Sequence, residues 1–224
     1  FDFFLQQLPI RVETMHRIGS PFDFSRQVLG YKPAVLPSLQ SDEYMFQLLS
    51  AIDSLLDRKA LILVTSHKAL ASAAHYLRGN GDRLLFIQGE QGAAPLVEAF
   101  RAAKSGILLV TMGYWQGMDL AGGDVDCLVM DRLPFKSPSD PLLQSIKQGL
   151  EDRESDFFLE FLLPDCALRL RQGFGRLIRR GSDRGVFVMG DARYWDASYA
   201  QYLQNNLPTF GWTDTLNDAI AFTG

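Results

Sequence analysis

The sequence lacks the features of several protein classes, beginning with cysteine. Its 224 residues contain two cysteines, Cys127 and Cys166, which lie far apart and form no CxxC pattern. Two thiols cannot close a structural zinc site or an iron–sulfur cluster held by protein ligands. We therefore interpret them as buried thiols in a reducing cytosol, and we expect this chain to bind no metal of its own.

Apolar runs long enough to cross a membrane are also missing. The sequence has no signal-peptide pattern and no apolar run near the roughly 18 residues that a transmembrane helix needs. Its 47% hydrophobic and 21% charged residues are typical of a globular domain. We expect one cytoplasmic domain over residues 1–224 with no membrane contact. Since the chain opens on Phe1 rather than methionine, we interpret it as a fragment of a longer polypeptide.

Several catalytic signatures are absent as well. The sequence has no GxxxxGK[ST] phosphate-cradling loop, no nucleophile elbow, no HExxH and no kinase signature. The acidic pair Asp42-Glu43 follows no apolar strand, so it does not match the magnesium-binding pair of a Walker B motif. These absences exclude a complete nucleotide hydrolase of the P-loop type.

The charge is weakly acidic but unevenly distributed. A formal net charge of −4 argues mildly against nucleic-acid binding, because domains that bind nucleic acids are often basic. However, six arginines fall between Arg169 and Arg184, whereas acidic residues gather at 151–156. A local basic segment on an acidic protein can still meet phosphates.

Short apolar runs and helical periods alternate along the chain. The predicted strands are Leu61–Thr65, Leu84–Gln88, Ile107–Thr111, Cys127–Asp131 and Val186–Gly190. Their continuous apolar character suits strands that are buried on both faces of a parallel sheet. The predicted helices are Asp42–Arg58, Ser66–Arg78, Ala94–Lys104 and Asp165–Arg180, the last with Asp165 as N-cap and Gly181 just past its end. This alternation predicts an α/β fold with a parallel sheet between layers of helices.

Two segments depart from that alternation. Residues 134–160 contain three prolines and a charged middle, and we interpret the stretch at about 134–165 as a helical excursion from the domain. Residues 194–224 resemble a helix, a Pro-Thr-Phe-Gly turn and a final short helix.

The loop after the third predicted strand is the richest candidate site. Ligands of parallel α/β sheets bind at the carboxyl ends of the strands. Residues 111–123 at such an end are rich in glycine, which lets a backbone approach a ligand closely, and they include Tyr114, Trp115 and Asp119. A carboxylate there can accept hydrogen bonds from ribose hydroxyls. The alternative is a connecting turn whose tryptophan packs into the core, and spacing alone favours that alternative.

A second candidate lies in the predicted helix Asp165–Arg180. Gln172, Arg176 and Arg179 are spaced four and three residues apart, which places them on one helix face. Two guanidinium groups beside a glutamine suit phosphate oxygens. Gly173 and Gly175 each cost a helix about 1 kcal/mol relative to alanine, which suggests that something approaches closely there. The alternative is a solvated basic face paired with nearby acids.

Weaker candidates follow the first two predicted strands. Thr65, Ser66 and His67 could bind phosphates through hydroxyl groups and helix N-terminal amides, and Gln88 could do similar work. We assign no catalytic role to His67, because a lone histidine in a turn is more often structural. Arginines that face phosphates in a chain without a phosphate cradle are typical of the arginine-finger half of a two-part site.

Five segments, which follow one another in the family's order along the chain, resemble the second motor domain of the DinG/XPD (Rad3-like) superfamily 2 DNA helicases, in particular the bacterial DinG and YoaA branch. GSPFDFSRQ resembles the entry to that domain, and LVMDRLPFKSPSDPLL resembles the stretch after motif V. ILVTSHKAL, LLVTMGYWQGMDLAG and RQGFGRLIRRGSDRGVFVMGDAR resemble motifs IV, V and VI. The resemblance covers about residues 17–220.

The resemblance implies a RecA-like, P-loop-NTPase-like fold without a Walker A motif. It implies that ATP and Mg²⁺ are held mainly by a preceding N-terminal helicase domain, which in many members also carries an iron–sulfur cluster. In this chain it places Gln172, Arg176, Arg179, Gly117 and Asp119 at the nucleotide. It further implies 5′–3′ movement along single-stranded DNA and a role in DNA repair.

The resemblance also implies a set of DNA contacts in this chain. These are Thr65, Ser66, Gln88, Thr111 and Trp115. The chain departs from the family at Gln116, where an acidic residue is usual, and this departure puts the coupling role of that position in doubt. Two further hypotheses stay open: an uncoupled scaffold that docks DNA or protein, and an unrelated nucleotide-binding α/β enzyme such as a sugar-nucleotide transferase.

Overall fold

A parallel sheet of seven strands forms the centre of the molecule. The computed structural model describes residues 14, 16, 19–36, 38–115, 125–137 and 140–223. The strand order is β3-β4-β2-β5-β6-β1-β7, and all neighbouring strands among the described residues pair in parallel. The predicted α/β class is therefore confirmed.

All five strands expected from the sequence are present, with ends within two residues of the predicted ones. They are β2 (Lys59–Val64), β3 (Leu85–Ile87), β4 (Gly106–Thr111), β5 (Cys127–Met130) and β6 (Gly185–Met189). β2, β4, β5 and β6 are buried along their whole length, as their uniformly apolar composition predicts. Two short strands were not predicted: β1 (Val28–Tyr31) and β7 (Gly211–Thr213).

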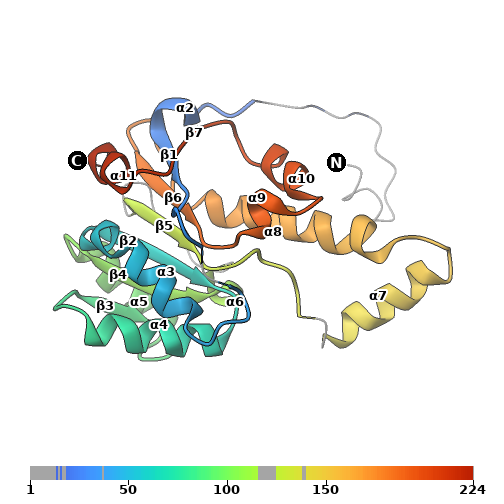
Figure 1. Cartoon of the computed structure of the whole chain (residues 1–224), viewed down its shortest axis with the longest axis horizontal. Coiled ribbons are helices and arrows are strands. Elements are labelled where there is room, and N and C mark those ends of the chain that lie inside the picture. Colours follow the sequence, from blue (N-terminus) through green and yellow to red (C-terminus); the bar gives the residue numbers. More distant parts are fainter. Residues whose placement is uncertain are drawn as a thin grey trace.

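Helices cover both faces of the sheet and make a three-layer sandwich (Figure 1). One face packs against α3 (Tyr44–Ala51), α4 (His67–Gly79) and α11 (Leu216–Phe222). The other packs against α5 (Ala93–Ala102), α8 (Leu163–Phe174), α9 (Arg193–Asp196) and α10 (Ala200–Asn205). Alternate residues of each strand enter opposite clusters, as in Leu61 and Ile62 of β2, because strand side chains alternate between faces.

Shorter helices complete the chain. They are α2 (Phe24–Gln27), α6 (Met112–Trp115), a 3₁₀ helix at Asp53–Asp57 and a π-helix at Phe158–Leu162 that runs directly into α8. Between β5 and the π-helix, α7 (Pro141–Glu151) extends away from the sheet (Figure 1).

Two predicted helices have different bounds in the structure. The run Asp42–Arg58 splits at Ile52 into α3 and the 3₁₀ helix. The predicted N-cap Asp165 is wrong, because α8 begins at Leu163 and continues from the π-helix. The Asp165 carboxylate instead accepts from Arg169 Nε at 2.6 Å and pairs with Lys136 at 3.3 Å. None of the described helices is both long and apolar enough to span a bilayer.

Candidate functional site

The carboxyl edge of the sheet brings together polar groups from neighbouring strands. Thr65 follows β2 and Asp131 follows β5, and these strands are adjacent. Asp131 Oδ1 accepts from the backbone nitrogen of Thr65 at 3.0 Å, and its Oδ2 lies 3.4 Å from the Thr65 hydroxyl. One carboxylate thus fixes the backbone turn that leads into α4. Ser66 caps that helix, because its hydroxyl accepts from the amide of Ala69 at 3.1 Å.

A second pair forms at the same edge between β3 and β4. The side-chain oxygen of Gln88 accepts from the backbone nitrogen of Thr111 at 2.7 Å and from its hydroxyl at 2.8 Å. Thr111 is buried, with 8% of its surface exposed, so its hydroxyl is already committed to Gln88. The structure therefore brings together two of the residues that the sequence selected separately.

Asp131 itself is fully buried, and burial raises the pKa of its carboxyl to about 7, although the amides of Arg132 and Thr65 oppose that rise. Its backbone carbonyl accepts from the Tyr44 hydroxyl, which also lies 3.1 Å from the carbonyl of Gly190. Tyr44 of α3 therefore links the ends of β5 and β6 at this edge.

The amino edge of the sheet carries the arginines. Residues 175–184 connect α8 to the start of β6, and Gln27 directly precedes β1, the neighbour of β6. The amide nitrogen of Gln27 donates to the carbonyls of Arg180 and Asp183 at 2.9 Å, and it lies 3.3 Å from the carbonyl of Gly181. The Asp183 carboxylate accepts from the amides of Arg179 and Arg180 at 2.8 and 2.7 Å. We call residues 175–184 the arginine loop.

The prediction of one continuous helix to Arg180 is wrong. α8 ends at Phe174 with Gly175 as its C-cap, and the following residues form a turn, so Gly181 does not end the helix. Gln172 lies exposed in the last turn of α8, whereas Arg176 and Arg179 lie beyond it and do not share its helix face. The helix ends early because two glycines weaken it, while Gln27 and Asp183 bind the next peptide groups in another conformation.

Several predicted site residues cannot be placed. Gly117 and Asp119, and the departing residue Gln116, lie outside the described residues. Trp115 ends α6, and its side chain is not among those described. His67 is the first residue of α4 and is exposed.

Four residues of these edges were missed by the sequence reading: Gln27, Tyr44, Asp131 and Asp183. Asp131 could have been found, since it ends a predicted strand and the carboxyl-end rule that selected Thr65 applies to it equally. Gln27 gave no such signal, because its side-chain contacts join segments more than 150 residues apart in sequence. The contacts of the Asp183 carboxylate are local, with amides three and four residues earlier, but the predicted helix to Arg180 left those amides no such role.

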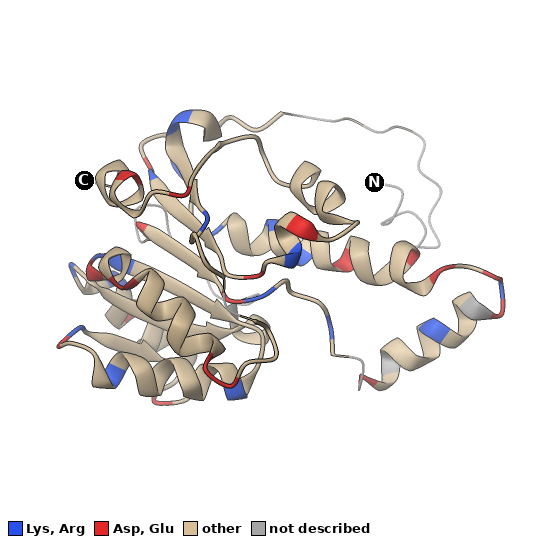
Figure 2. Ribbon diagram, in the orientation of Figure 1, with Lys and Arg blue, Asp and Glu red and all other residues tan. Residues whose placement is uncertain are grey.

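Charge is mixed along the whole ribbon, with basic and acidic segments interspersed over every layer (Figure 2). The six arginines of 169–184 do not form one stripe, because α8 carries some and the arginine loop carries others. Among the described residues, no group of three or more histidine, cysteine or acidic side chains could hold a metal ion.

With this geometry established, comparison with known proteins identifies the family. The helicase C-terminal domain model matches residues 48–210, more than half of the chain. The chain belongs to the helicase C-terminal domain family. Its DinG/XPD-like character, inferred from the motifs, is confirmed by its relatives.

The chain is similar to curated helicases of several bacteria. It is 32% identical to the ATP-dependent DNA helicase YoaA of Escherichia coli, over 98% of the chain and 35% of that protein. It is 33% identical to the ATP-dependent helicase DinG of Mycobacterium tuberculosis, over 88% of the chain and 30% of that protein. The chain therefore spans about a third of the length of these curated relatives.

The fold of the domain is shared with a solved structure. Xpd4 of S. tokodaii matches 91% of the chain and 42% of its own length, with a TM-score of 0.59 and 17% identity. The predicted RecA-like fold is thus confirmed.

Proposed function

We propose that this chain is the C-terminal motor domain of an ATP-dependent DNA helicase, and that one edge of its sheet contacts ATP while the other binds DNA. The amino edge supplies arginines to ATP bound on a separate N-terminal domain, together with Mg²⁺. The carboxyl edge grips single-stranded DNA. The relatives named as ATP-dependent helicases support this assignment.

The anchoring of the arginine loop is the observation that carries the proposal. Gln27 and Asp183, both buried, hold its backbone through hydrogen bonds that leave Arg179 partly exposed and Arg180 exposed. A loop fixed in this way presents guanidinium groups with little further loss of entropy when phosphates arrive, which suits charge stabilisation in a transition state. No Walker A motif is present, so the phosphate cradle must come from another domain.

Individual roles follow from the resemblance to the family. Arg176 and Arg179 face the γ-phosphate as arginine fingers, with Gln172 beside them on the last turn of α8. Gly117 and Asp119 line the nucleotide cleft. An iron–sulfur cluster, where present, belongs to the N-terminal part and not to this chain.

The carboxyl edge is the proposed DNA surface. Thr65, Ser66, Gln88 and Thr111 lie along the ends of β2, β3 and β4, and Trp115 follows in α6. Closure of the two domains on ATP and opening after hydrolysis would move this edge along the strand in the 5′–3′ direction. The cellular setting is DNA repair in the cytoplasm.

DNA-stimulated ATP hydrolysis by the full-length protein tests the proposal. Wild type, Arg179→Ala and the control Arg153→Ala, whose arginine is exposed in the turn after α7, are compared with and without single-stranded DNA. We expect strong stimulation in wild type and in the control. Arg179→Ala should lose turnover by about 10³-fold with little change in ATP affinity, because an arginine finger acts mainly on the transition state.

The competing function is a scaffold that docks DNA or protein without coupled hydrolysis. The net charge of −4 and the glutamine at Gln116 favour it. It predicts DNA binding with no DNA-stimulated hydrolysis in a folded wild-type protein, which is the result that would reject the motor function.

A further inference from the structure

We propose that Arg132, with Lys68 opposite, binds a phosphate of the single-stranded DNA backbone in a cavity beside Ser66. This inference rests on the proposed function and extends it to two residues to which the family resemblance assigned no role. It begins from the charge of the DNA-binding edge.

The residues expected to touch DNA carry no positive charge. Thr65, Ser66, Gln88, Thr111 and Trp115 are all neutral, and the carboxylate of Asp131 is hydrogen-bonded to Thr65. Affinity for nucleic acid comes mostly from lysine and arginine, which neutralise phosphates and release counterions. A DNA-binding edge therefore requires cations close to these neutral groups.

Arg132 lies at the carboxyl edge of the sheet, next to Thr65. It follows Asp131 at the end of β5, and its backbone nitrogen donates to Asp131 Oδ1, the atom that also accepts from Thr65. The connections that leave the adjacent strands β2 and β5 run in opposite directions along the sheet, to β3 and to β6. Ligands of parallel α/β sheets bind at such a switch point.

The guanidinium of Arg132 is fixed in position but keeps hydrogen-bond donors for a ligand. It lies over the ring of Tyr44 at 4.5 Å, and its Nη2 donates to the carbonyl of Leu39 at 2.9 Å. Its buried Nε has no hydrogen-bond acceptor among the described residues. Stacking on the ring fixes the plane of the group, so an incoming oxyanion meets a preorganised donor.

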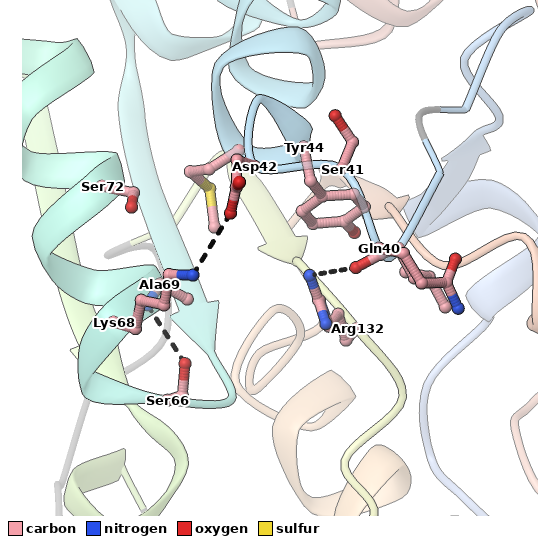
Figure 3. Close-up of a pocket in the computed structure, with 11 residues that line it drawn as sticks. Gln40, Ser41, Asp42, Tyr44, Ser66, Lys68, Ala69, Ser72 and Arg132 are labelled. Carbon is pink, nitrogen blue, oxygen red and sulfur yellow. Dashed lines mark hydrogen bonds and ion pairs between the residues drawn. The ribbon is translucent and has the colours of Figure 1, made fainter.

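A cavity of about 200 Å³ lies next to this group. Arg132 and Tyr44 form one wall, and Ser66, Lys68 and Ser72 of the α4 segment form the facing wall (Figure 3). A water takes about 30 Å³ of liquid volume, so this space admits a phosphate group with a few waters.

Lys68 provides the second cation at the cavity. Its ammonium lies 3.4 Å from the Asp42 carboxylate, and both side chains are almost fully exposed, at 86% and 95%. An exposed pair of this kind is held weakly, so Lys68 can exchange Asp42 for a phosphate at small cost. The chemistry of the cavity is therefore that of a phosphate site with one fixed and one mobile cation.

The position of the cavity favours a DNA phosphate over a phosphate of ATP. The cavity opens at the carboxyl edge beside Ser66, whereas the arginine loop lies at the amino edge of the same sheet. A nucleotide phosphate held by Arg179 could not reach Arg132 across the length of the strands.

The experiment measures binding of the full-length protein to a fluorescent oligothymidylate over a series of salt concentrations. Wild type is compared with Arg132→Ala, Arg132→Lys and the control Arg153→Ala, and the KM for ATP and the thermal unfolding midpoint are measured in parallel. We expect Arg132→Ala to lose about tenfold in affinity and to lower the salt slope by about 1, because one phosphate contact is removed. Arg132→Lys should keep the slope and lose part of the affinity, since the charge remains but the planar fork does not.

Each alternative outcome overturns the inference in a recognisable way. An unchanged affinity and slope in Arg132→Ala would remove the phosphate site while leaving the proposed helicase function intact. A loss of affinity with an unchanged slope would assign Arg132 a structural role only, and a change confined to the KM for ATP would assign the cavity to nucleotide. Failure of wild type itself to bind would overturn both this inference and the proposed function.

Discussion

The carboxylate oxygen Oδ2 of Asp183 lies 2.8 Å from the backbone nitrogen of Arg179. It accepts from the next amide, that of Arg180, at 2.7 Å, so one buried side chain sets the conformation of two arginines. Gln27 holds the same loop from the other side through its carbonyls. The position of the proposed arginine finger is therefore determined by residues that do not themselves reach the nucleotide.

We predict that Asp183→Ala lowers the ATP turnover of the full-length protein by about ten- to a hundredfold, because a displaced finger no longer meets the transition state. The KM for ATP should change little. Asp183→Asn is the matched control, since its side-chain oxygen can accept from the same two amides. Equal turnover in Asp183→Ala and wild type would show that the finger does not depend on this anchor.

Gln27→Leu should act on the same loop through a different set of groups. It leaves the carbonyls of Arg180, Gly181 and Asp183 without their donor, which costs about 1–3 kcal/mol of stability because those groups are partly buried. Turnover should fall while affinity for single-stranded DNA stays the same, because the loop lies at the opposite edge. Parallel loss of DNA affinity in a binding titration would argue against separate edges.

Asp131 gives the chain a specific dependence of stability on pH. Burial raises the pKa of its carboxyl to about 7 in the folded state, so the folded chain binds this proton more tightly than the unfolded chain does. Its contribution to stability is complete below about pH 4 and is lost as the pH rises through about 7. We predict that Asp131→Asn, which stays neutral, gains in unfolding midpoint relative to wild type between about pH 5 and about pH 8.

Thermal unfolding at a series of pH values measures that difference. The exposed Asp82→Asn serves as the control for loss of a carboxylate elsewhere in the chain. A constant difference between Asp131→Asn and wild type over the whole range would contradict the raised pKa.

Gly190 is required by close packing at the end of β6. A Cβ at this position would lie 2.6 Å from Leu48 Cδ2, 2.7 Å from the carbonyl of Asp131 and 3.0 Å from the Tyr44 hydroxyl. We predict that Gly190→Ala destabilises the chain by about 1–3 kcal/mol, because the neighbouring backbone cannot yield. Gly149→Ala in α7, where nothing lies within 4 Å, should instead stabilise it by about 0.5–1 kcal/mol. Denaturant unfolding of both variants decides whether the two effects have opposite signs.

The central strands were predictable because continuous apolar runs in the sequence indicate strands that are buried on both faces. β1 and β7 were missed because each is short and contains a glycine, and their strand character depends on tertiary packing. Trp212 of β7, for example, packs edge-on against Trp195 with ring centroids 4.4 Å apart. No local pattern in three residues reports such a contact.

The candidate site was predictable in part for the same reason. Residues at strand ends, such as Thr65 and Gln88, followed from the rule on carboxyl edges. The arginine loop did not, because the spacing of Arg176 and Arg179 matched a helix. The backbone there is held in another conformation by Asp183 within the loop and by Gln27 from a distant part of the chain. Residues spaced three and four apart share a face only where the backbone between them is helical.

The most direct test of the separate edges measures turnover, ATP affinity and affinity for single-stranded DNA together in the full-length protein, for wild type and Arg179→Ala. The account predicts that turnover falls by about 10³-fold while both affinities stay close to those of wild type. Unchanged turnover, or a DNA affinity that falls together with turnover, would contradict the assignment of phosphate chemistry to the arginine loop and of DNA to the opposite edge.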